Sequence, residues 1–381
     1  MRVSASFLAR YADGLTCYAD GMFRALPFFL ACGFAFGQRS VDSDLAAILK
    51  SHKLPGGAVV VFNRDQILAT GVAGVRESGK PARITLDDRF NIGSNAKAML
   101  ATTLAFLVED GTLAWNSRVS DVLMPPNLHA AYGSVTLTNL LNHHAGLPPF
   151  EDDSSPEWRA WIAAPREGPA GKPVQRFARW VLAQPPRVPP GTEMLYSNAG
   201  YAAAAAMAEQ TTGLDWKNLM RSRLFAALGM DADFGLPAAS AGQPAGHYET
   251  KNGVTVQGLN DATPPILQPA GDVQLSILNY AKFLQFHLRG LAGIQGALPA
   301  ETVQFMHTPA GKAGLGWGIR DYDGARASVH SGSAGSFYAV TILIPSRNLG
   351  IAVLLNAGGK RADAACGAAA KKLLARFKTS R

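Results

Sequence analysis

Short hydrophobic runs rich in strand-forming residues concentrate towards the two ends of the chain. The segment GGAVVVFNRDQILATGVAG, residues 56–74, holds two such runs around Asn63-Arg64-Asp65, which predicts an antiparallel hairpin preceded by a helix over 41–51. After Gly314, four runs predict strands, and a helix over 363–377 closes the chain. The four runs are LGWGIRDYD, ASVHSGS, SFYAVTILIP and GIAVLLNAG, the last two forming a hairpin across Ser346-Arg347-Asn348.

Helical patterns dominate the middle of the chain. Three helices are predicted to begin near Ser94, Ala199 and Ser276 and to end at Gly111, Gly213 and Gly290. Each of these glycines occupies the position after a helix where left-handed backbone is common. Between the helices, a long Pro-rich loop over 147–191 is expected to shape a cleft, with Trp158 and Trp161 lining or covering it.

Strands at both ends with helices between them predict an α/β (α+β) fold. Its antiparallel sheet is built from both chain ends and flanked by helices, and it carries an inserted, mainly helical domain. We assign residues 41–112 and 290–381 to the sheet domain and residues 113–289 to the insert. The groove between them is the expected active site.

Composition excludes several classes of function. The chain has 381 residues, 48% hydrophobic and 17% charged, as is ordinary for a globular protein. Its formal net charge is +8, but the Lys and Arg residues are scattered, with no basic run interleaved with aromatics, so we expect no nucleic-acid partner. The three cysteines form no CxxC pair, which disfavours disulfide or zinc scaffolding.

Residues 1–38 form a leader. MFRALPFFLACGFAFGQ, from Met22 to Gln38, has a basic residue, a short apolar run and a small-x-small end, which predicts a secretory signal starting at Met22. The run is too short to span a bilayer, so we expect no transmembrane segment in the mature protein and export to a bacterial periplasm. Cys32 lies in a poor lipoprotein box, which makes lipid anchoring the minority interpretation.

The first chemical motif is Ser94-x-x-Lys97, at the head of an otherwise nearly uncharged helix pattern. Positions i and i+3 share a helix face, so the serine hydroxyl and the lysine amine can meet. A buried lysine whose neutral form is favoured can take the proton of a serine nucleophile. By itself the motif is weak, because SxxK occurs by chance in many chains.

Two further motifs lie downstream. Tyr196-Ser197-Asn198 precedes an alanine-rich helix, where Asn198 could be an N-cap and Tyr196 a core residue. Paired with SxxK, Tyr196 becomes a candidate base or proton shuttle. His330-Ser331-Gly332 lies on a predicted strand, where a small residue such as Gly332 allows a substrate backbone to approach.

Together the three motifs resemble the signature of the penicillin-recognising serine hydrolases: SxxK, then YxN about a hundred residues on, then HxG near the end of the chain. The likeness is greatest to the branch of class C β-lactamases, D,D-carboxypeptidases and family VIII esterases, and it covers residues 45–375. Supporting segments match the family as well: LTNLLNHHAGLP resembles LLTHTSGLP, PGTEMLYSNAGY resembles PGxxxxYSNxGY, LFAALGM resembles FxPLGM, PAGDVQLSILNYAKF resembles PAGGLxSTxxDLxRF, and GLGWG resembles the strand before the third motif.

The resemblance implies roles for residues around the serine. Ser94 would be the acylated nucleophile, with Lys97 and Tyr196 as the proton-transfer pair. Asn198 would donate a hydrogen bond that orients the substrate. The reaction would need no cofactor and no metal.

The resemblance also implies roles on the strand. The N–H groups of Ser94 and Ser333 would form an oxyanion hole, where loss of one donor typically costs about 3 kcal/mol of transition-state stabilisation. His330 and Ser331 would polarise the site and receive a substrate carboxylate beside Gly332. Many β-lactamases have Lys at the position of His330, and a histidine is only partly charged near neutral pH, which lowers the expectation of efficient β-lactamase activity.

Other features of the sequence fit alternative kinds of site poorly. Adjacent His143 and His144 suggest a zinc pair, but neighbouring histidines point in different directions and no HExxH is present, so we interpret them as a loop brace. Gly314-Leu315-Gly316 lacks the strand-to-helix context of a dinucleotide fingerprint. The absence of GxSxG disfavours an α/β-hydrolase, and the absence of ExxLN disfavours a class A enzyme.

The sequence thus predicts an exported serine hydrolase that forms an acyl-enzyme at Ser94. Its substrate would be a small molecule or a peptide, including peptidoglycan-derived fragments: D-amino acid peptides, esters or, weakly, β-lactams. The alternative is a sensor that binds penicillin or a cell-wall fragment without turnover. The complete set of three motifs argues against that alternative.

Overall fold

The computed structural model describes residues 39–151, 155–164, 171–322 and 324–378. The predicted leader, 1–38, lies outside the described residues. The described residues form a single compact unit. The described part of the chain contains no helix with the length and apolar character needed to cross a membrane.

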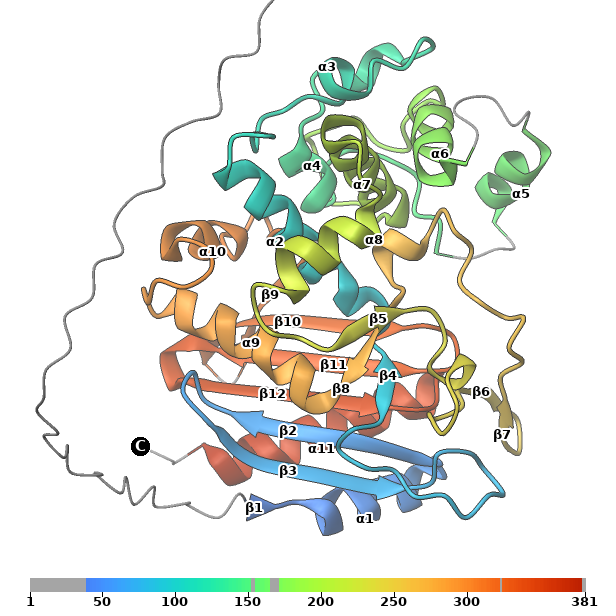
Figure 1. Cartoon of the computed structure of the whole chain (residues 1–381), viewed down its shortest axis with the longest axis vertical. Coiled ribbons are helices and arrows are strands. Elements are labelled where there is room, and N and C mark those ends of the chain that lie inside the picture. The colour runs from blue at the N-terminus through green and yellow to red at the C-terminus, as the bar shows by residue number, and fades with distance from the viewer. Residues whose placement is uncertain (1–38, 152–154, 165–170, 323, 379–381) are drawn as a thin grey trace, which may run out of the picture. The chain divides into compact units, whose positions relative to one another are not determined.

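The main sheet has seven strands in the order β1-β3-β2-β12-β11-β10-β9 (Figure 1). Its two halves meet where β2 pairs antiparallel with β12, so strands from both chain ends form one sheet, as predicted. Every pair is antiparallel except β1 with β3. The strands are β1 (Arg39–Ser40), β2 (Gly56–Phe62), β3 (Ile67–Gly74), β9 (Gly318–Tyr322), β10 (Ala325–Ser333), β11 (Tyr338–Ile344) and β12 (Leu349–Leu355).

Both faces of this sheet are covered, which explains why β2 is hydrophobic at nearly every position. Val59 and Val61 face the terminal helices α1 (Asp42–His52) and α11 (Lys360–Phe377), whereas Val60 and Phe62 face the second, larger core. Helix α9 (Ile277–Leu291) packs against β2 and β12. Most of α9 lies within the predicted insert, residues 113–289, and yet this helix covers the sheet. The division into a sheet domain (41–112 and 290–381) and an insert stays a prediction.

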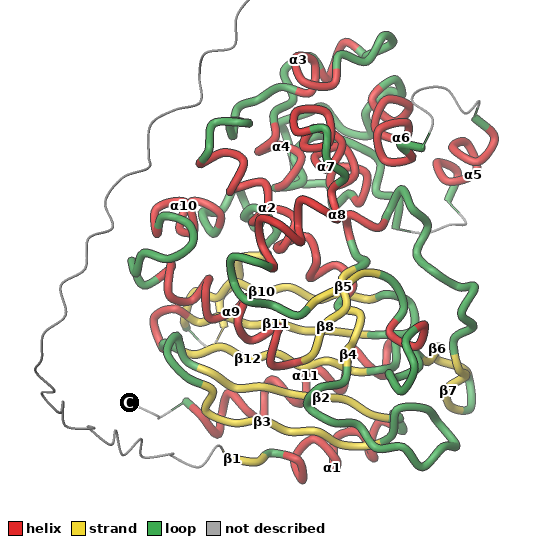
Figure 2. The backbone as a smooth tube through the Cα atoms, viewed as in Figure 1, coloured by secondary structure: helices red, strands yellow, loops and turns green. Residues whose placement is uncertain are grey.

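Figure 2 shows the remaining helices mostly above the strands of the main sheet. Among the helices, α2 (Ala96–Glu109) is buried on nearly all sides. The other helices of this group are α3 (Val119–Leu123), α4 (Leu137–Leu141), α5 (Pro156–Ala163), α6 (Pro173–Leu182), α7 (Asn198–Thr212), α8 (Trp216–Leu219) and α10 (Ala300–Met306). The prediction of one long loop over 147–191 was wrong, since α5 and α6 lie within it. Pro156 and Pro173 are the first residues of these helices, where a missing N–H costs nothing.

Two of the three helices end at the glycine that the sequence predicted, and the third does not. Gly111 and Gly213 adopt left-handed backbone just after α2 and α7. The prediction for Gly290 was wrong, because α9 continues to Leu291 and Gly293 adopts the left-handed conformation. A Cβ on Gly290 would lie 2.6 Å from Cβ of Val303, so this glycine lets α9 pack closely on α10.

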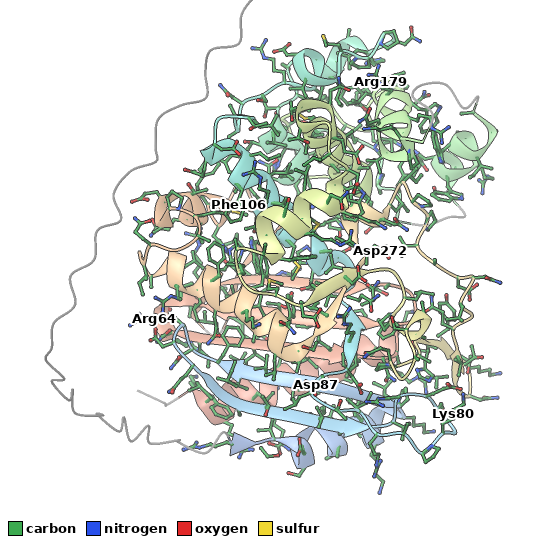
Figure 3. The ribbon with its side chains drawn as sticks, viewed as in Figure 1. Arg64, Lys80, Asp87, Phe106, Arg179 and Asp272 are labelled. Atoms are coloured by element: carbon green, nitrogen blue, oxygen red, sulfur yellow. The ribbon has the colours of Figure 1, made fainter. Side chains whose placement is uncertain are left out.

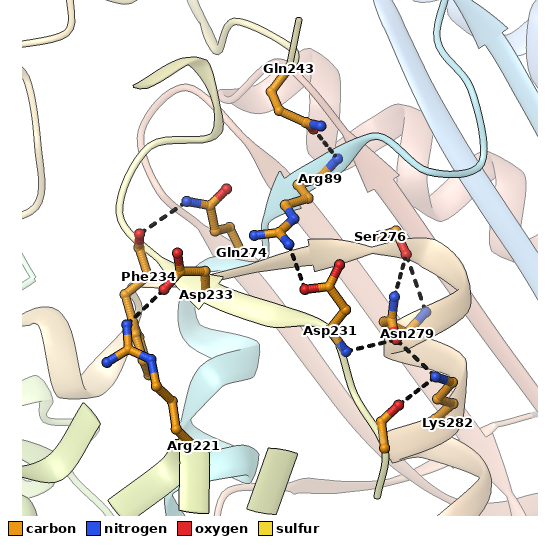
Figure 4. A network of polar contacts seen from close by, with 11 residues as sticks. Arg89, Arg221, Asp231, Asp233, Phe234, Gln243, Gln274, Ser276, Asn279 and Lys282 are labelled. Carbon is orange, nitrogen blue, oxygen red and sulfur yellow. Dashed lines mark hydrogen bonds and ion pairs between the residues drawn. The ribbon is translucent and has the colours of Figure 1, made fainter. Parts of the chain in front are cut away.

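A second sheet, which the sequence analysis missed, positions the segment before Ser94. It has the order β4-β8-β5, and its strands are β4 (Arg89–Asn91), β8 (Val273–Ser276) and β5 (Ala232–Phe234). Figure 4 shows how polar side chains hold it: Arg89 donates to Asp231 from its side chain and to Gln243 from its backbone N–H. Ile92 N–H then donates to the Val273 carbonyl, which brings the chain directly to the serine motif. Strands β6 (His247–Thr250) and β7 (Gly253–Val256) form a separate two-stranded hairpin that is paired with neither sheet.

Candidate active site

A cavity of about 840 Å³ brings the three sequence motifs together. Ser94, Tyr196 and Asn198 line it, as do the four strand residues 330–333. These groups come from the 3₁₀ turn before α2, from the loop before α7 and its first residue, and from the end of β10. Lys97 lies beneath Ser94 and is fully buried.

Ser94 and Lys97 are in direct contact. Ser94 belongs to a single 3₁₀ turn, η1 (Gly93–Asn95), and Lys97 to the first turn of α2. The Lys97 Nζ lies 2.8 Å from Ser94 Oγ and donates to the Ala270 carbonyl at 2.9 Å. Burial lowers the pKa of Lys97 from 10.5 to about 7, so a large fraction of the amine is neutral near neutral pH. A neutral amine at hydrogen-bonding distance can accept the serine proton.

Tyr196 lies against the same amine, with Lys97 Nζ 4.8 Å from its ring centroid. Burial raises the pKa of Tyr196, while its hydrogen bond with Ser94 acts in the opposite direction. The phenol is therefore protonated near neutral pH. This makes Lys97 the better proton acceptor and leaves Tyr196 able to pass a proton along.

The loop that carries Tyr196 is braced by His143. Ser197 N–H donates to His143 Nδ1 at 3.1 Å, and the His143 ring packs on Tyr196 with centroids 4.5 Å apart. His144 instead bonds its own loop through the carbonyl of Asn142. The two histidines thus brace a loop, as predicted. No group of three metal-ligating side chains occurs among the residues the structure describes.

Ser197, not Asn198, is the N-cap of α7, because its Oγ accepts from the N–H of Gly200. Asn198 Nδ2 donates to the Phe150 carbonyl at 2.9 Å, and Asn198 Oδ1 has no hydrogen-bond partner among the described atoms. The amide nitrogen of Asn198 carries two N–H donors, of which one is bound to the Phe150 carbonyl. The role of Asn198 as a donor to the substrate stays a prediction.

Strand β10 reaches the serine through close backbone packing. Its pairing with β9 ends at Val329, so residues 330–333 continue beyond that neighbour. A Cβ on Gly332 would lie 2.2 Å from the Ile92 carbonyl oxygen, and one on Gly93 would lie 2.7 Å from the Ser333 nitrogen. Glycine at 332 is thus required by the protein's own backbone, and it places Ser333 beside Ser94.

His330 is a weak cation in this environment. Its burial, and secondarily the charge of Lys97, lower its pKa to about 4, so the ring is neutral near neutral pH. Its Nδ1 lies 2.8 Å from the Ser331 carbonyl oxygen. A neutral ring offers a substrate carboxylate no fixed positive charge, and the role of His330 in receiving such a group stays a prediction.

Three charged residues of the cavity wall were missed by the sequence analysis: Asp363 of α11 and two residues close to the matched segments. Glu151 follows the GLPP segment, and Arg320 lies on β9; both line the cavity. Each lies next to a matched segment, but neither falls in a motif, so only proximity to those segments could have signalled them. Trp158 and Trp161 were expected to line the groove; they instead pack with Phe177 and its neighbours and are not among the described lining residues.

A buried carboxyl group lies close to the lysine-binding carbonyl. Asp272 (labelled in Figure 3) follows Ala270 by two residues and is 1% exposed. Burial raises its pKa to about 7, opposed by Lys217, whose Nζ lies 3.8 Å from the carboxylate. At this position the family segment quoted above has a glycine, so the buried acid is a departure from the family pattern.

Some enzymes activate a serine with a lysine instead of a histidine, and the fold and site place this chain in that class of serine hydrolases. The family model described as Beta-lactamase matches residues 41–375, and the chain belongs to that family.

Individual relatives and a solved structure are also similar to this chain. The chain is 28% identical over 336 residues to "Penicillin-binding protein 4" of Amycolatopsis lactamdurans, covering 82% of this chain and 83% of the relative. It is 23% identical to "D-alanyl-D-alanine-carboxypeptidase/endopeptidase AmpH" of Escherichia coli K12, covering 84% of each. The fold matches the solved structure of "D-alanine Carboxypeptidase AmpC" from Burkholderia cenocepacia with a TM-score of 0.68, at 22% identity, over 87% of this chain and 97% of that one.

Proposed function

We propose that this protein hydrolyses ester or amide bonds through an acyl-enzyme on Ser94. The observation that carries the proposal is the 2.8 Å contact between Ser94 Oγ and a fully buried lysine whose pKa is lowered to about 7. Such a lysine is poised to gain and lose a proton during each turnover.

The proposed reaction has two steps. Ser94 Oγ bonds to the substrate carbonyl carbon while its proton passes to Lys97, and the N–H groups of Ser94 and Ser333 stabilise the oxyanion. The leaving group departs with a proton delivered from Lys97 through Tyr196. Water then attacks the ester, its proton returns by the same route, and Ser94 is regenerated.

The proposed substrates are D-amino acid peptides, carboxylic esters and, weakly, β-lactams. The names of the relatives support peptides and penicillins, and the neutral His330 weakens the case for substrates that depend on a carboxylate. We further propose that the protein acts after export, on small molecules or peptidoglycan-derived peptides. The signal pattern of Met22 to Gln38 supports export.

The test combines labelling with turnover. The wild-type protein should gain a covalent adduct from a fluorescent penicillin or a fluorophosphonate, and peptide mapping should place it on Ser94. Ser94→Ala should abolish the adduct and lower turnover of nitrophenyl butyrate and a D-Ala-D-Ala peptide by more than about 10³-fold. Labelling that persists in Ser94→Ala would refute the nucleophile assignment, and a stoichiometric adduct without turnover would favour the sensor.

A further inference from the structure

The segment 270–273, which leads into β8, supports the serine motif at two points. The carbonyl of Ala270 accepts a hydrogen bond from Lys97 Nζ at 2.9 Å. The carbonyl of Val273 accepts from Ile92 N–H at 3.0 Å, just before the turn that carries the serine. A shift of this segment would therefore move both the acceptor that holds the lysine amine and the strand that leads to the nucleophile.

The side chain of Asp272, in the middle of this segment, forms an ion pair with Lys217 of α8. The Asp272 side chain is 1% exposed, and its Oδ2 lies 3.8 Å from Lys217 Nζ. Neither carboxylate oxygen has a hydrogen-bond partner among the described atoms. A buried charge is costly unless it is paired, so the lysine is the group that compensates this carboxylate.

Lys217 is itself held by aromatic rings of the same region. Its Nζ lies 5.5 Å from the ring centroid of Trp216 and 5.3 Å from that of Phe234, which are distances of cation–π contacts. Phe234 lies on β5 and pairs with Val273 of β8. Its carbonyl accepts from Gln274 Nε2, as Figure 4 shows. The ion pair therefore joins the segment 270–273 to a partner of fixed position.

The backbone of Asp272 connects its side chain to the carbonyl of Ala270. Its N–H donates to the Gln268 carbonyl at 3.1 Å, and its own carbonyl accepts from Gly235 N–H at 3.0 Å. A glycine, which the family segment has at this position, allows the same backbone hydrogen bonds but gives the backbone more freedom and no side chain to anchor. The acid therefore adds a tether to a segment that already contacts Lys97.

The charges around the two ionisable side chains are different. Asp272 is faced by Lys217 of α8 and, more weakly, by Asp233 of β5. Among the described groups, Glu151 is the one whose charge acts on the pKa of Lys97, and it raises that pKa. Direct charge effects of Asp272 on Lys97 are therefore small. The other titratable groups around Lys97 are neutral near neutral pH: Tyr196, Tyr201, His143 and His330.

We propose that Asp272 and Lys217 are positioning residues for the lysine of the serine motif, because their ion pair holds the Ala270 carbonyl where it orients the amine. The inference rests on the proposed hydrolase function of Ser94. Without the tether, the carbonyl moves away from the amine, and the charged form of Lys97 loses an acceptor. The pKa of Lys97 then falls further, and the amine transfers the serine proton less efficiently.

The experiment measures rates of fluorophosphonate labelling between pH 5 and 9 for the wild type, Asp272→Asn and Lys217→Met. In both variants the midpoint of the rising limb should move to lower pH by about 0.5–1 unit, a part of what a hydrogen bond to a charged group contributes. The plateau should fall about fivefold to tenfold, because the amine is less well oriented. Lys217→Arg, which keeps the cation, should retain the midpoint of the wild type.

The two variants separate positioning from a direct charge effect. Asp272→Asn removes a negative charge and Lys217→Met removes a positive one, so a direct charge effect on Lys97 would not lower the midpoint in both. A merely structural role would lower the Tm and leave the midpoint unchanged. Either result overturns the proposal. Asp272→Gly, which introduces the glycine of the family segment, should show the same shift and replaces any variant that does not fold.

Asp233→Asn is the matched control. Asp233 lies on β5, its side chain is 48% exposed, and it pairs with Arg221 at 2.8 Å, so its variant should keep the midpoint and the plateau of the wild type. A wild type that is not labelled overturns the hydrolase function together with this proposal. Labelling without a rising limb overturns the role of Lys97 as the base, and with it the positioning role. A rising limb that is unshifted in the variants overturns the positioning role alone.

Discussion

Burial favours the neutral forms of two neighbouring groups, the amine of Lys97 and the phenol of Tyr196. For Lys97 the neutral form is the base, whereas for Tyr196 it is the acid. Because Lys97 is fully buried and its pKa falls to about 7, we expect it to act as the base at physiological pH. Tyr196, whose pKa is raised, is suited to relay a proton and not to accept one first.

This assignment predicts the pH dependence of acylation. Only neutral Lys97 accepts the Ser94 proton, so the acylation rate should rise with pH and level off above a midpoint near 7. Lys97→Met should lower the plateau by at least about 10²-fold and remove the rising limb. Rates of fluorophosphonate labelling between pH 5 and 9 measure both effects.

Lys80→Met provides the control for that series, because the Lys80 side chain is 64% exposed and pairs only with Glu77 on the surface. Its profile should match that of the wild type. An unchanged midpoint in Lys97→Met would show that another group sets the acid limb.

At the scale of elements, the site depends on how β10 meets the turn that carries Ser94. The Gly332 and Gly93 positions have room for no side chain, because each faces backbone of the opposite element. Interatomic distances under 3.0 Å to backbone atoms cannot be relieved by a rotamer change. The proposed oxyanion donors, Ser94 and Ser333, are therefore held together by two glycines on different elements.

Gly332→Ala should separate β10 from this turn, because the added Cβ would lie 2.2 Å from the Ile92 carbonyl oxygen. We expect a labelling rate lower by about 10²-fold or more, as for loss of an oxyanion donor, together with a reduced Tm and retained far-UV circular dichroism. Gly253→Ala, where a Cβ meets open space, should label normally. Normal labelling of Gly332→Ala would contradict the proposed oxyanion hole.

At the scale of the whole molecule, a buried hydrogen-bonded chain links the serine helix to the sheet. Thr102 of α2 contacts His287 of α9 at 3.1 Å, His287 contacts His307 at 2.9 Å, and His307 contacts Ser328 of β10 at 2.7 Å. Thr102 Oγ1 donates to the Ala98 carbonyl, so it accepts from His287, which in turn accepts from His307. This arrangement requires a neutral His287, because its Nδ1 must accept from His307.

This network predicts loss of stability in acid. Burial lowers the pKa of His287 to about 3 and that of His307 well below its ordinary value, so between pH 6.5 and about 3 the unfolded chain binds protons that the folded rings do not. The unfolding free energy should therefore fall as pH falls through that window, by at most about 1.4 kcal/mol per pH unit for each ring. Urea denaturation at several pH values measures the slope.

His287→Gln should reduce this slope, because one of the two rings is removed, and should lower stability at pH 7 by about 1–3 kcal/mol through unsatisfied partners. His52→Gln near the surface end of α1 should alter neither. An unchanged slope in His287→Gln would assign the acid sensitivity to other groups.

The sequence alone was sufficient for the parts of this protein that depend on local pattern. Strand runs at both ends predicted the joint sheet and its two hairpins, because burial on both faces makes such strands hydrophobic throughout. The i, i+3 spacing predicted the contact of Ser94 with Lys97, which the helix itself imposes. The Pro-rich segment misled, since proline is as compatible with the first residue of a helix as with a loop.

Only the tertiary structure decided what depends on groups distant in the sequence. The lowered pKa of Lys97 follows from burial by several elements. One amide N–H of Asn198 is bound by the distant Phe150 carbonyl, and Glu151 joins the cavity wall because the YSN loop binds the carbonyls before it. No local pattern encodes these contacts. The spacing of the motifs therefore indicated which reactive groups are present. Long-range packing decided the protonation of Lys97, the hydrogen bonds of Asn198 and the charges that line the cavity.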